Sequence, residues 1–193
     1  MLLHLPHLRA LVLVFLSAFV AGCASTSFTV SPTPQAPVCE PASTALVLWA
    51  PAWRSDQKDP GERETAAATG LQNFFDTSGC FTRTELRRIA DLSPATVSAQ
   101  TAVSAGRFSR VVVIAVRELG PVVQLLSSAA LVEGGTEVVL QVGQYSATGA
   151  TPTREFNVHW KNGGPGVLKG VTSLPADMQA ALAAGLQPSE AAR

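Results

Sequence analysis

The sequence of 193 residues is poor in the side chains on which many enzymes and nucleic-acid-binding proteins depend. It has three histidines, and two of them, His4 and His7, lie within the first ten residues. Charged residues make up 15% of the chain, with 14 Lys and Arg against 14 Asp and Glu, so no net charge attracts a polyanion. We therefore expect no nucleic-acid partner.

The same scarcity bears on catalysis. His159 is the one remaining candidate for a histidine-based relay, and it is predicted on the solvent side of a strand with no acid beside it. No group of His, Cys and carboxylates has metal-ligand spacing, and the glycine-rich "NGGPG" lacks the Lys and Ser/Thr of a phosphate loop. We therefore expect no enzyme activity, no catalytic residues, no metal and no cofactor.

The uncharged run over residues 10–22 is too short for a transmembrane helix, which needs about 20 apolar residues. Arg9 precedes the run, and the small residues Ala21 and Gly22 end it. A basic start, an apolar centre and a small-residue end are typical of a secretory signal peptide. Residues 1–22 are therefore predicted to be a leader, which leaves Cys23 to be explained.

The stretch Val20-Ala21-Gly22-Cys23 resembles the lipobox of bacterial lipoproteins. In that family a diacylglycerol is joined to the cysteine, which becomes the first residue of the mature chain. The resemblance implies lipidation of Cys23, with palmitate-type acyl chains that hold the protein stably to a membrane. Ala24 is not the aspartate that favours inner-membrane retention, so the resemblance implies the periplasmic face of the outer membrane. The alternative is an ordinary secretory signal that happens to contain Cys23.

Residues 23–43 contain four prolines among Ser, Thr and Ala and show no apolar period. This composition predicts a tether, and about 20 extended residues at about 3.1 Å each would hold a domain roughly 60 Å from the lipid. Residues 44–187 are predicted to form one domain, and residues 188–193 a tail.

The predicted fold class is α+β: β-α-β-α followed by an antiparallel β-meander and a C-terminal helix, in a mixed sheet with helices mainly on one face. Asp59 is a predicted helix cap, and turns are predicted at 118–121 and 134–135. Strands are predicted over 44–50, 80–89, 108–119, 122–132, 136–146 and 153–161, and helices over 60–79, 94–105 and 175–186.

With Cys23 lipidated, Cys39 and Cys80 remain as a pair in a compartment that favours disulfides. Each lies just before a predicted strand, and a helical crossover makes those two strands parallel. Both cysteines then fall at the same end of the sheet, which predicts a disulfide between them. Two free thiols are the alternative.

Two segments are candidate binding surfaces. Trp53 and Arg54 follow the first central strand at its carboxyl end, where open α/β sheets commonly place their sites. Tryptophan and arginine are also enriched in interface hot spots. The second segment, residues 154–169, contains Trp160, which the alternation of the strand assigns to the core. We therefore predict partner binding at Trp53 and Arg54, and the alternative is that Trp49 belongs to the core and this loop is only a connection.

The order "ALVLWAP", helix, "RVVVIAVREL", "TEVVLQVGQYSATGATPTREFNVHW" and a closing Ala/Leu helix resembles a group of envelope lipoproteins. The group includes penicillin-binding-protein activators, curli-secretion lipoproteins and polysaccharide-export lipoproteins. Auxiliary lipoproteins of lipid-trafficking transport systems are a second resemblance.

The lipobox, the tether and the shortage of catalytic groups together predict a non-enzymatic module that binds or assembles another envelope protein, with a homo-oligomer as a further option. The alternative is a carrier of a small ligand or lipid, which would need an apolar cavity under the meander.

Overall fold

The structure is a computed structural model that describes residues 24–33, 35–126, 131–147 and 151–187. The predictions made for residues 1–23 and 188–193, lipidation of Cys23 among them, lie outside the described residues. Within the described ranges, no helix combines the length and the apolar composition needed to cross a membrane.

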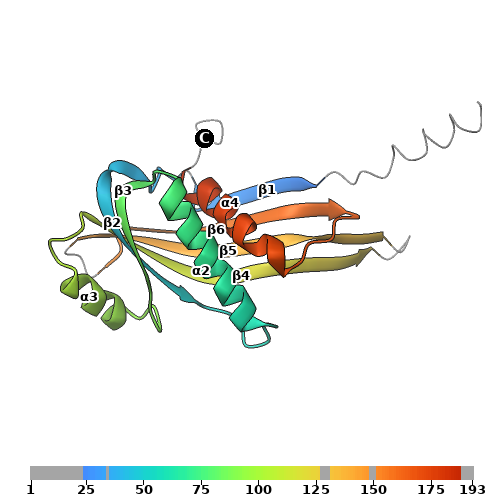
Figure 1. Cartoon of the computed structure of the whole chain (residues 1–193), viewed down its shortest axis with the longest axis horizontal. Coiled ribbons are helices and arrows are strands. Elements are labelled where there is room, and N and C mark those ends of the chain that lie inside the picture. Colours follow the sequence, from blue (N-terminus) through green and yellow to red (C-terminus); the bar gives the residue numbers. More distant parts are fainter. Residues whose placement is uncertain (1–23, 34, 127–130, 148–150, 188–193) are drawn as a thin grey trace, which may run out of the picture.

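The described residues form one six-stranded mixed sheet in the order β1-β6-β5-β4-β2-β3 (Figure 1). Strand β2 is parallel to both β3 and β4, and every other pair of neighbours is antiparallel. The elements are β1 (Ser25–Ser31), β2 (Glu40–Pro51), α2 (Pro60–Thr77), β3 (Phe81–Arg88), α3 (Pro94–Val103), β4 (Arg110–Leu126), β5 (Leu131–Ser146), β6 (Arg154–Pro165), the 3₁₀ turn η1 (Val171–Ser173) and α4 (Leu174–Leu186). The predicted α+β class is confirmed.

Helices α2 and α4 lie side by side over one face of the sheet, and α3 lies at one end (Figure 1). The larger core cluster fills the space under α2 and α4. It includes Val47, Trp49, Leu71, Phe74, Ile114, Leu140, Phe156, Trp160, Met178 and Leu182. A smaller cluster packs α3 against the opposite face through Leu46, Leu48, Val97, Phe108, Val111 and Val113. Helices therefore cover mainly one face, as predicted.

Strand β2 explains why its sequence is a continuous apolar run. Residues 45–50 are all buried, and they alternate between the two core clusters. Its neighbour β3 is the edge strand, in agreement with the polar sequence after Phe81. Helix α3 begins where predicted, because the Ser93 hydroxyl accepts a hydrogen bond from the Thr96 amide at 3.3 Å.

Cys39 and Cys80 form the predicted disulfide, with Cα atoms 4.5 Å apart. The register explains the pairing, because the next residues along the chain, Glu40 and Phe81, are partners in the parallel β2–β3 ladder. The bridge joins residues 41 positions apart, a loop length worth about 4 kcal/mol in the chain-entropy account of disulfides.

The predicted tether is wrong over Ser25–Ser31, which is the edge strand β1. This strand pairs with β6 from Ser25 opposite Gly163 to Ser31 opposite Asn157. Alternation of Phe28 and Val30 with small polar residues suits a half-covered edge strand, but it lacks the longer apolar pattern that marks a central one. The sheet therefore already includes Ser25–Ser31, ahead of the predicted domain start at residue 44.

The meander has three strands and not four, because the turn predicted at 118–121 lies inside the single long strand β4. Val116 is the last β4 residue paired with β2, and from there only β5 borders β4. On the side of β4 that no other strand borders, a backbone N–H makes no hydrogen bond to a neighbouring strand, so a proline there removes none. Pro121 therefore does not end the strand.

The glycines predicted to form a turn at 134–135 also lie inside a strand. Gly135 of β5 is paired with Gly163 of β6, and a Cβ on Gly135 would stand 2.8 Å from the Gly163 Cα and 2.5 Å from the Asn162 carbonyl oxygen. These glycines allow a close approach of two backbones. For the same reason β6 continues past residue 161, where the strand is predicted to end, as far as Pro165.

Candidate functional site

A cleft lies where β2 ends and the chain turns toward α2. The loop begins with the Ala52 amide bonded to the Val116 carbonyl oxygen at 2.9 Å, which places it against β4. Two adjoining hollows of about 430 and 410 Å³ share Arg54, Glu118 and Glu137. We call them together the β2–α2 cleft. Its other lining residues are Ala52, Trp53, Asp56, Gln57, Lys58, Arg63, Arg117, Pro121 and Val139.

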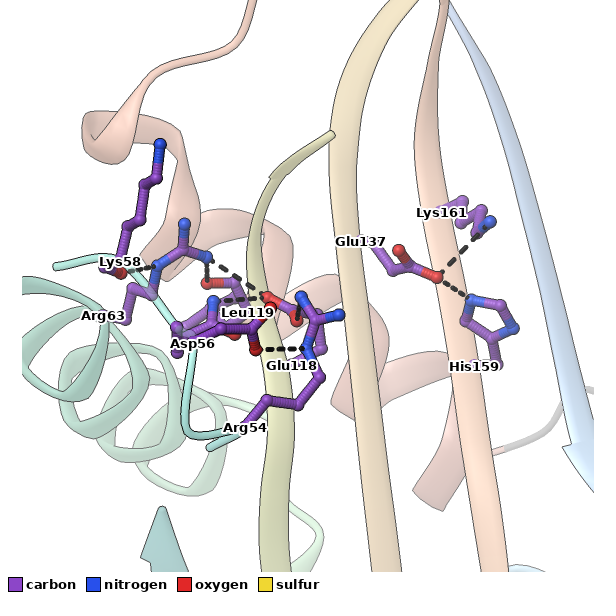
Figure 2. A network of polar contacts seen from close by, with 10 residues as sticks. Arg54, Asp56, Lys58, Arg63, Glu118, Leu119, Glu137, His159 and Lys161 are labelled. Atoms are coloured by element: carbon purple, nitrogen blue, oxygen red, sulfur yellow. Dashed lines mark hydrogen bonds and ion pairs between the residues drawn. The ribbon is translucent and has the colours of Figure 1, made fainter. Parts of the chain in front are cut away.

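Glu118 is the centre of the polar contacts in this cleft (Figure 2). It follows a β-bulge in β4, which turns the side chain toward the loop. Its carboxylate accepts hydrogen bonds from Gln57 Nε2 at 2.9 Å and Arg63 Nη1 at 3.2 Å, and it pairs with Arg54 Nη2 at 3.3 Å. The carboxylate is mostly covered and therefore binds the loop, the helix and the strand into one unit.

Arg63, in the first turn of α2, is the second buried charge of the cleft. Its Nη1 donates to the Leu119 carbonyl oxygen at 2.6 Å, and its Nε donates to the Lys58 carbonyl oxygen at 2.7 Å. Gly120 makes room for it, since a Cβ there would stand 1.4 Å from Nη1. Asp59 occupies the predicted N-cap position of this helix, but its backbone angles are left-handed and its side chain makes no capping hydrogen bond.

The two predicted binding residues differ in their surroundings. Trp53 is half-buried against the core, and its indole nitrogen is buried without a hydrogen-bond partner. Arg54 is 68% exposed, and it pairs with Glu118 and, at 3.8 Å, with Asp56. Only Arg54 therefore presents most of its side chain to a partner, while Trp53 holds the loop against the sheet.

A second group of charges begins at Glu137 in the wall of the cleft and continues across the face of the sheet opposite α2 and α4, which we call the open face. Glu137 of β5 contacts His159 Nε2 of β6 and lies 3.3 Å from Lys161 Nζ (Figure 2). The prediction that no acid stands beside His159 is therefore wrong. The alternation of each strand assigns these residues to one face, but the register that joins them is not readable from the sequence.

The chemistry available to this group is ionic pairing. Among the hydrogen bonds of the described residues, His159 makes none to a Ser, Thr or Cys side chain. Nor do any three His, Cys, Asp or Glu side chains gather closely enough within those ranges to hold a metal ion. On the same face, Gln141 joins Arg117 to Glu155 through bonds of 3.0 and 2.7 Å. The open face thus presents a continuous set of hydrogen-bonding groups.

A third hollow, of about 240 Å³, lies beside the start of β2, near the disulfide. Glu40 and Arg110 line it and form a bidentate pair with two contacts of 3.0 Å. Hydrogen bonds from Arg110 and Ser43 hold the pKa of Glu40 below its usual value. In the same hollow, burial and the nearby Glu155 carboxylate raise the pKa of Tyr145. Charged side chains thus line all three hollows, unlike the apolar cavity that a lipid carrier would need.

Trp160, in the second predicted surface, is 3% exposed and belongs to the core, as expected. Lys169 lies 5.8 Å above its ring and pairs with Asp177 at 2.6 Å. Arg154 binds the segment that leads into β2, donating to the Ala36 carbonyl oxygen at 2.7 Å. These contacts are structural and leave the β2–α2 cleft as the candidate site.

No protein-family model and no curated protein matches the chain. Among solved structures, the PelC dodecamer from Paraburkholderia phytofirmans is 12% identical, with a TM-score of 0.43, over 83% of this chain and 95% of that one. A homologue of the neuraminyllactose-binding hemagglutinin from Helicobacter pylori is 12% identical, with a TM-score of 0.40, over 83% and 94%. Likeness at this level assigns neither a family nor a function.

Proposed function

We propose that this protein is a non-enzymatic lipoprotein of the bacterial outer membrane, facing the periplasm, whose domain binds another envelope protein. The proposal starts from Val20-Ala21-Gly22-Cys23 at the end of an uncharged leader. The disulfide between Cys39 and Cys80 supports it, because disulfides persist in oxidising compartments such as the periplasm.

The observation that carries the proposal is the distance along the chain from Cys23 to the fold. Ala24 alone separates Cys23 from Ser25, the first residue of β1. A mature chain whose first residue is Cys23 would therefore enter the edge strand β1 almost at once. No linker would separate the lipidated cysteine from the sheet. Acyl chains on Cys23 would hold the domain directly at the bilayer and not some 60 Å away.

The β2–α2 cleft is the surface that we assign to the partner. Arg54 is exposed at its rim, and Glu118 and Arg63 below it are held in place by mutual contacts, so the surface is preorganised. Charges of both signs line the cleft, which favours a partner surface with complementary charges. The partner is therefore a protein with acidic and basic groups in its interface.

The membrane half of the proposal is tested by metabolic labelling with palmitate. The expected result is label in the mature protein and its loss in Cys23→Ser, which should also leave the membrane fraction. Wild-type protein that takes up no palmitate, or a Cys23→Ser variant that stays in the membrane fraction, would contradict the proposal.

The partner half is tested by a photo-crosslinking residue at position 54 in living cells, with position 76 as the control. Asp76 is also exposed, but it lies near the other end of α2 and outside the cleft. We expect a discrete crosslinked product from position 54 alone. Identical products from both positions, or none from position 54, would rule out the cleft as the binding surface.

A further inference from the structure

One end of the sheet combines strand positions of aliphatic composition with two exposed apolar side chains, Leu168 and Val171. The register defines this end, because Ser25 pairs with Gly163, Gly163 with Gly135, and Gly135 with Val122. We call the part of the molecule at and beyond this row the anchor end. In Figure 1 it is the side on which β1 begins and β4 ends, opposite α3.

Strands β4 and β5 continue past the row as a ribbon, from Val122 opposite Gly135 to Leu126 opposite Leu131, and β6 borders β5 as far as Pro165 opposite Glu133. The strand positions after Pro121 in β4 and before Glu133 in β5 carry no charged residue. They are occupied by Gln124 and six aliphatic residues: Val122, Val123, Leu125, Leu126, Leu131 and Val132. A ribbon of this composition suits an apolar or interfacial medium.

The loop after β6 adds exposed apolar side chains at the same end. Pro165, the last residue of β6, is paired with Glu133 of the ribbon. Shortly after it come Leu168, 82% exposed, and Val171, 41% exposed. These are two of the four large hydrophobic side chains that are exposed among the described residues, the others being Phe28 and Val103.

We propose that the anchor end rests in the interfacial layer of a phospholipid bilayer, an inference that depends on the proposed lipidation of Cys23. The two residues from Cys23 to Ser25 span about 7 Å when extended. A bilayer that holds acyl chains on Cys23 must therefore lie within that distance of the row of Ser25. Strand positions 125–126 and 131–132, which are all aliphatic, lie past the row, and Leu168 is at the same end, so they enter the same layer, and the bilayer is their partner. The one charged position of the ribbon, Glu133, lies between them and the row.

Insertion has two consequences. It adds apolar contact to the acyl anchor, which strengthens membrane binding. It also gives the domain a fixed orientation, with the long axis of the sheet pointing away from the membrane and α3 at the far end (Figure 1). The β2–α2 cleft then lies directly next to the anchor end on its periplasmic side, since its lining residue Pro121 adjoins Val122 of the row.

The test uses the acylated full chain, because the disulfide and the acyl group leave an introduced cysteine as its single free thiol. An NBD fluorophore is attached to Leu168→Cys or, as the matched control, to Val103→Cys, which replaces an exposed valine at the α3 end. The protein is reconstituted into phosphatidylethanolamine and phosphatidylglycerol vesicles that contain doxyl-labelled lipid. Intact mass reports acylation of the same sample, and thermal unfolding confirms that both variants are folded.

The expected result is blue-shifted NBD emission and about threefold more quenching at position 168 than at position 103. Equal spectra and equal quenching in a protein that carries the acyl chains would overturn the inference and leave the proposed lipoprotein intact. A mature protein without acyl chains on Cys23 would overturn both.

Discussion

Glu118 is the residue on which the β2–α2 cleft depends, because it meets groups from the loop and from α2. We predict that Glu118→Gln lowers the free energy of unfolding by about 2 kcal/mol, since the mostly buried Arg63 loses its counter-charge. Urea denaturation measures the loss.

Asp56→Asn is the matched control for that variant. Asp56 is 76% exposed and pairs with Arg54 at 3.8 Å, so its replacement should cost about 0.5 kcal/mol or less. Equal losses of unfolding free energy in the two variants would show that burial of the Glu118–Arg63 pair adds nothing to stability.

A pH dependence is expected at Glu40. Its pKa is held below the unfolded value by Arg110 and Ser43, so the pair stabilises the fold above the unfolded pKa of about 4.3. That contribution disappears as the pH falls through the lower pKa of the folded state. Since both partners are more than one-third exposed, we expect Glu40→Gln to cost only about 0.5–1 kcal/mol at pH 7.

The measurement is urea denaturation of wild type and Glu40→Gln at several values of pH from neutral to acid. The difference in the free energy of unfolding between the two proteins should shrink below about pH 5. In that range Glu40 of the unfolded chain binds a proton while Glu40 of the folded chain is still ionised. A difference that stays constant over the whole range would show that the contact is not ionic.

The chemistry of single residues was only partly visible in the sequence. Trp53 and Arg54 could be chosen because the carboxyl end of a central strand is a known place for sites. Glu118, the ion-pair partner of Arg54, lies more than 60 positions away in a segment whose sequence predicts a turn. Glu137 and His159 are joined by a strand register that no local pattern specifies.

At the scale of elements, two glycines in α2 test how the helices pack. A Cβ on Gly70 would stand 2.6 Å from the Met178 Cβ and 2.7 Å from the Pro175 carbonyl oxygen of α4. Because one of these atoms is backbone, the helices must move apart. We predict that Gly70→Ala costs about 2 kcal/mol despite the better helix propensity of alanine.

Gly61, in the first turn of the same helix, is the control. A Cβ there would meet nothing within 4 Å, so Gly61→Ala should stabilise the protein by about 0.5 kcal/mol. Thermal and chemical unfolding of both variants shows whether each substitution raises or lowers the free energy of unfolding. Stabilisation by Gly70→Ala would contradict the close packing of α2 on α4.

Elements with strong local patterns were predictable, and those that depend on neighbours were not. The apolar run of β2 and the prolines at the starts of α3 and α4 can be recognised in the sequence without knowledge of their neighbours. Strand β1 exists only because β6 lies beside it, and β4 continues through Pro121 only because one side of it is bare. Both facts belong to the assembled sheet, so a linear pattern of residues does not contain them.

At the scale of the whole molecule, β1 completes the sheet along β6. We predict that a chain beginning at residue 33 is less stable than one beginning at residue 24 by roughly 2 kcal/mol or more, from seven cross-strand pairs at a few tenths each. The bare edge of β6 should also promote association between copies.

Unfolding curves and light scattering of the two chains test this prediction. The shorter chain should form larger assemblies at the same concentration, while the longer chain keeps its edge covered. Equal stability and equal mass in solution would show that β1 is dispensable.

Strand β1 also determines how the molecule would bear a mechanical load. A pull on the chain at residue 24, along the sheet, stretches the β1–β6 ladder lengthwise, so its hydrogen bonds share the force and do not open one at a time. If the ladder breaks, the chain is extended only as far as Cys39. Cys39 forms a disulfide with Cys80, and its amide donates a hydrogen bond to the Leu186 carbonyl oxygen. Tension on the N-terminus is thus borne first by a sheared strand and then by a covalent bond, before it reaches the core.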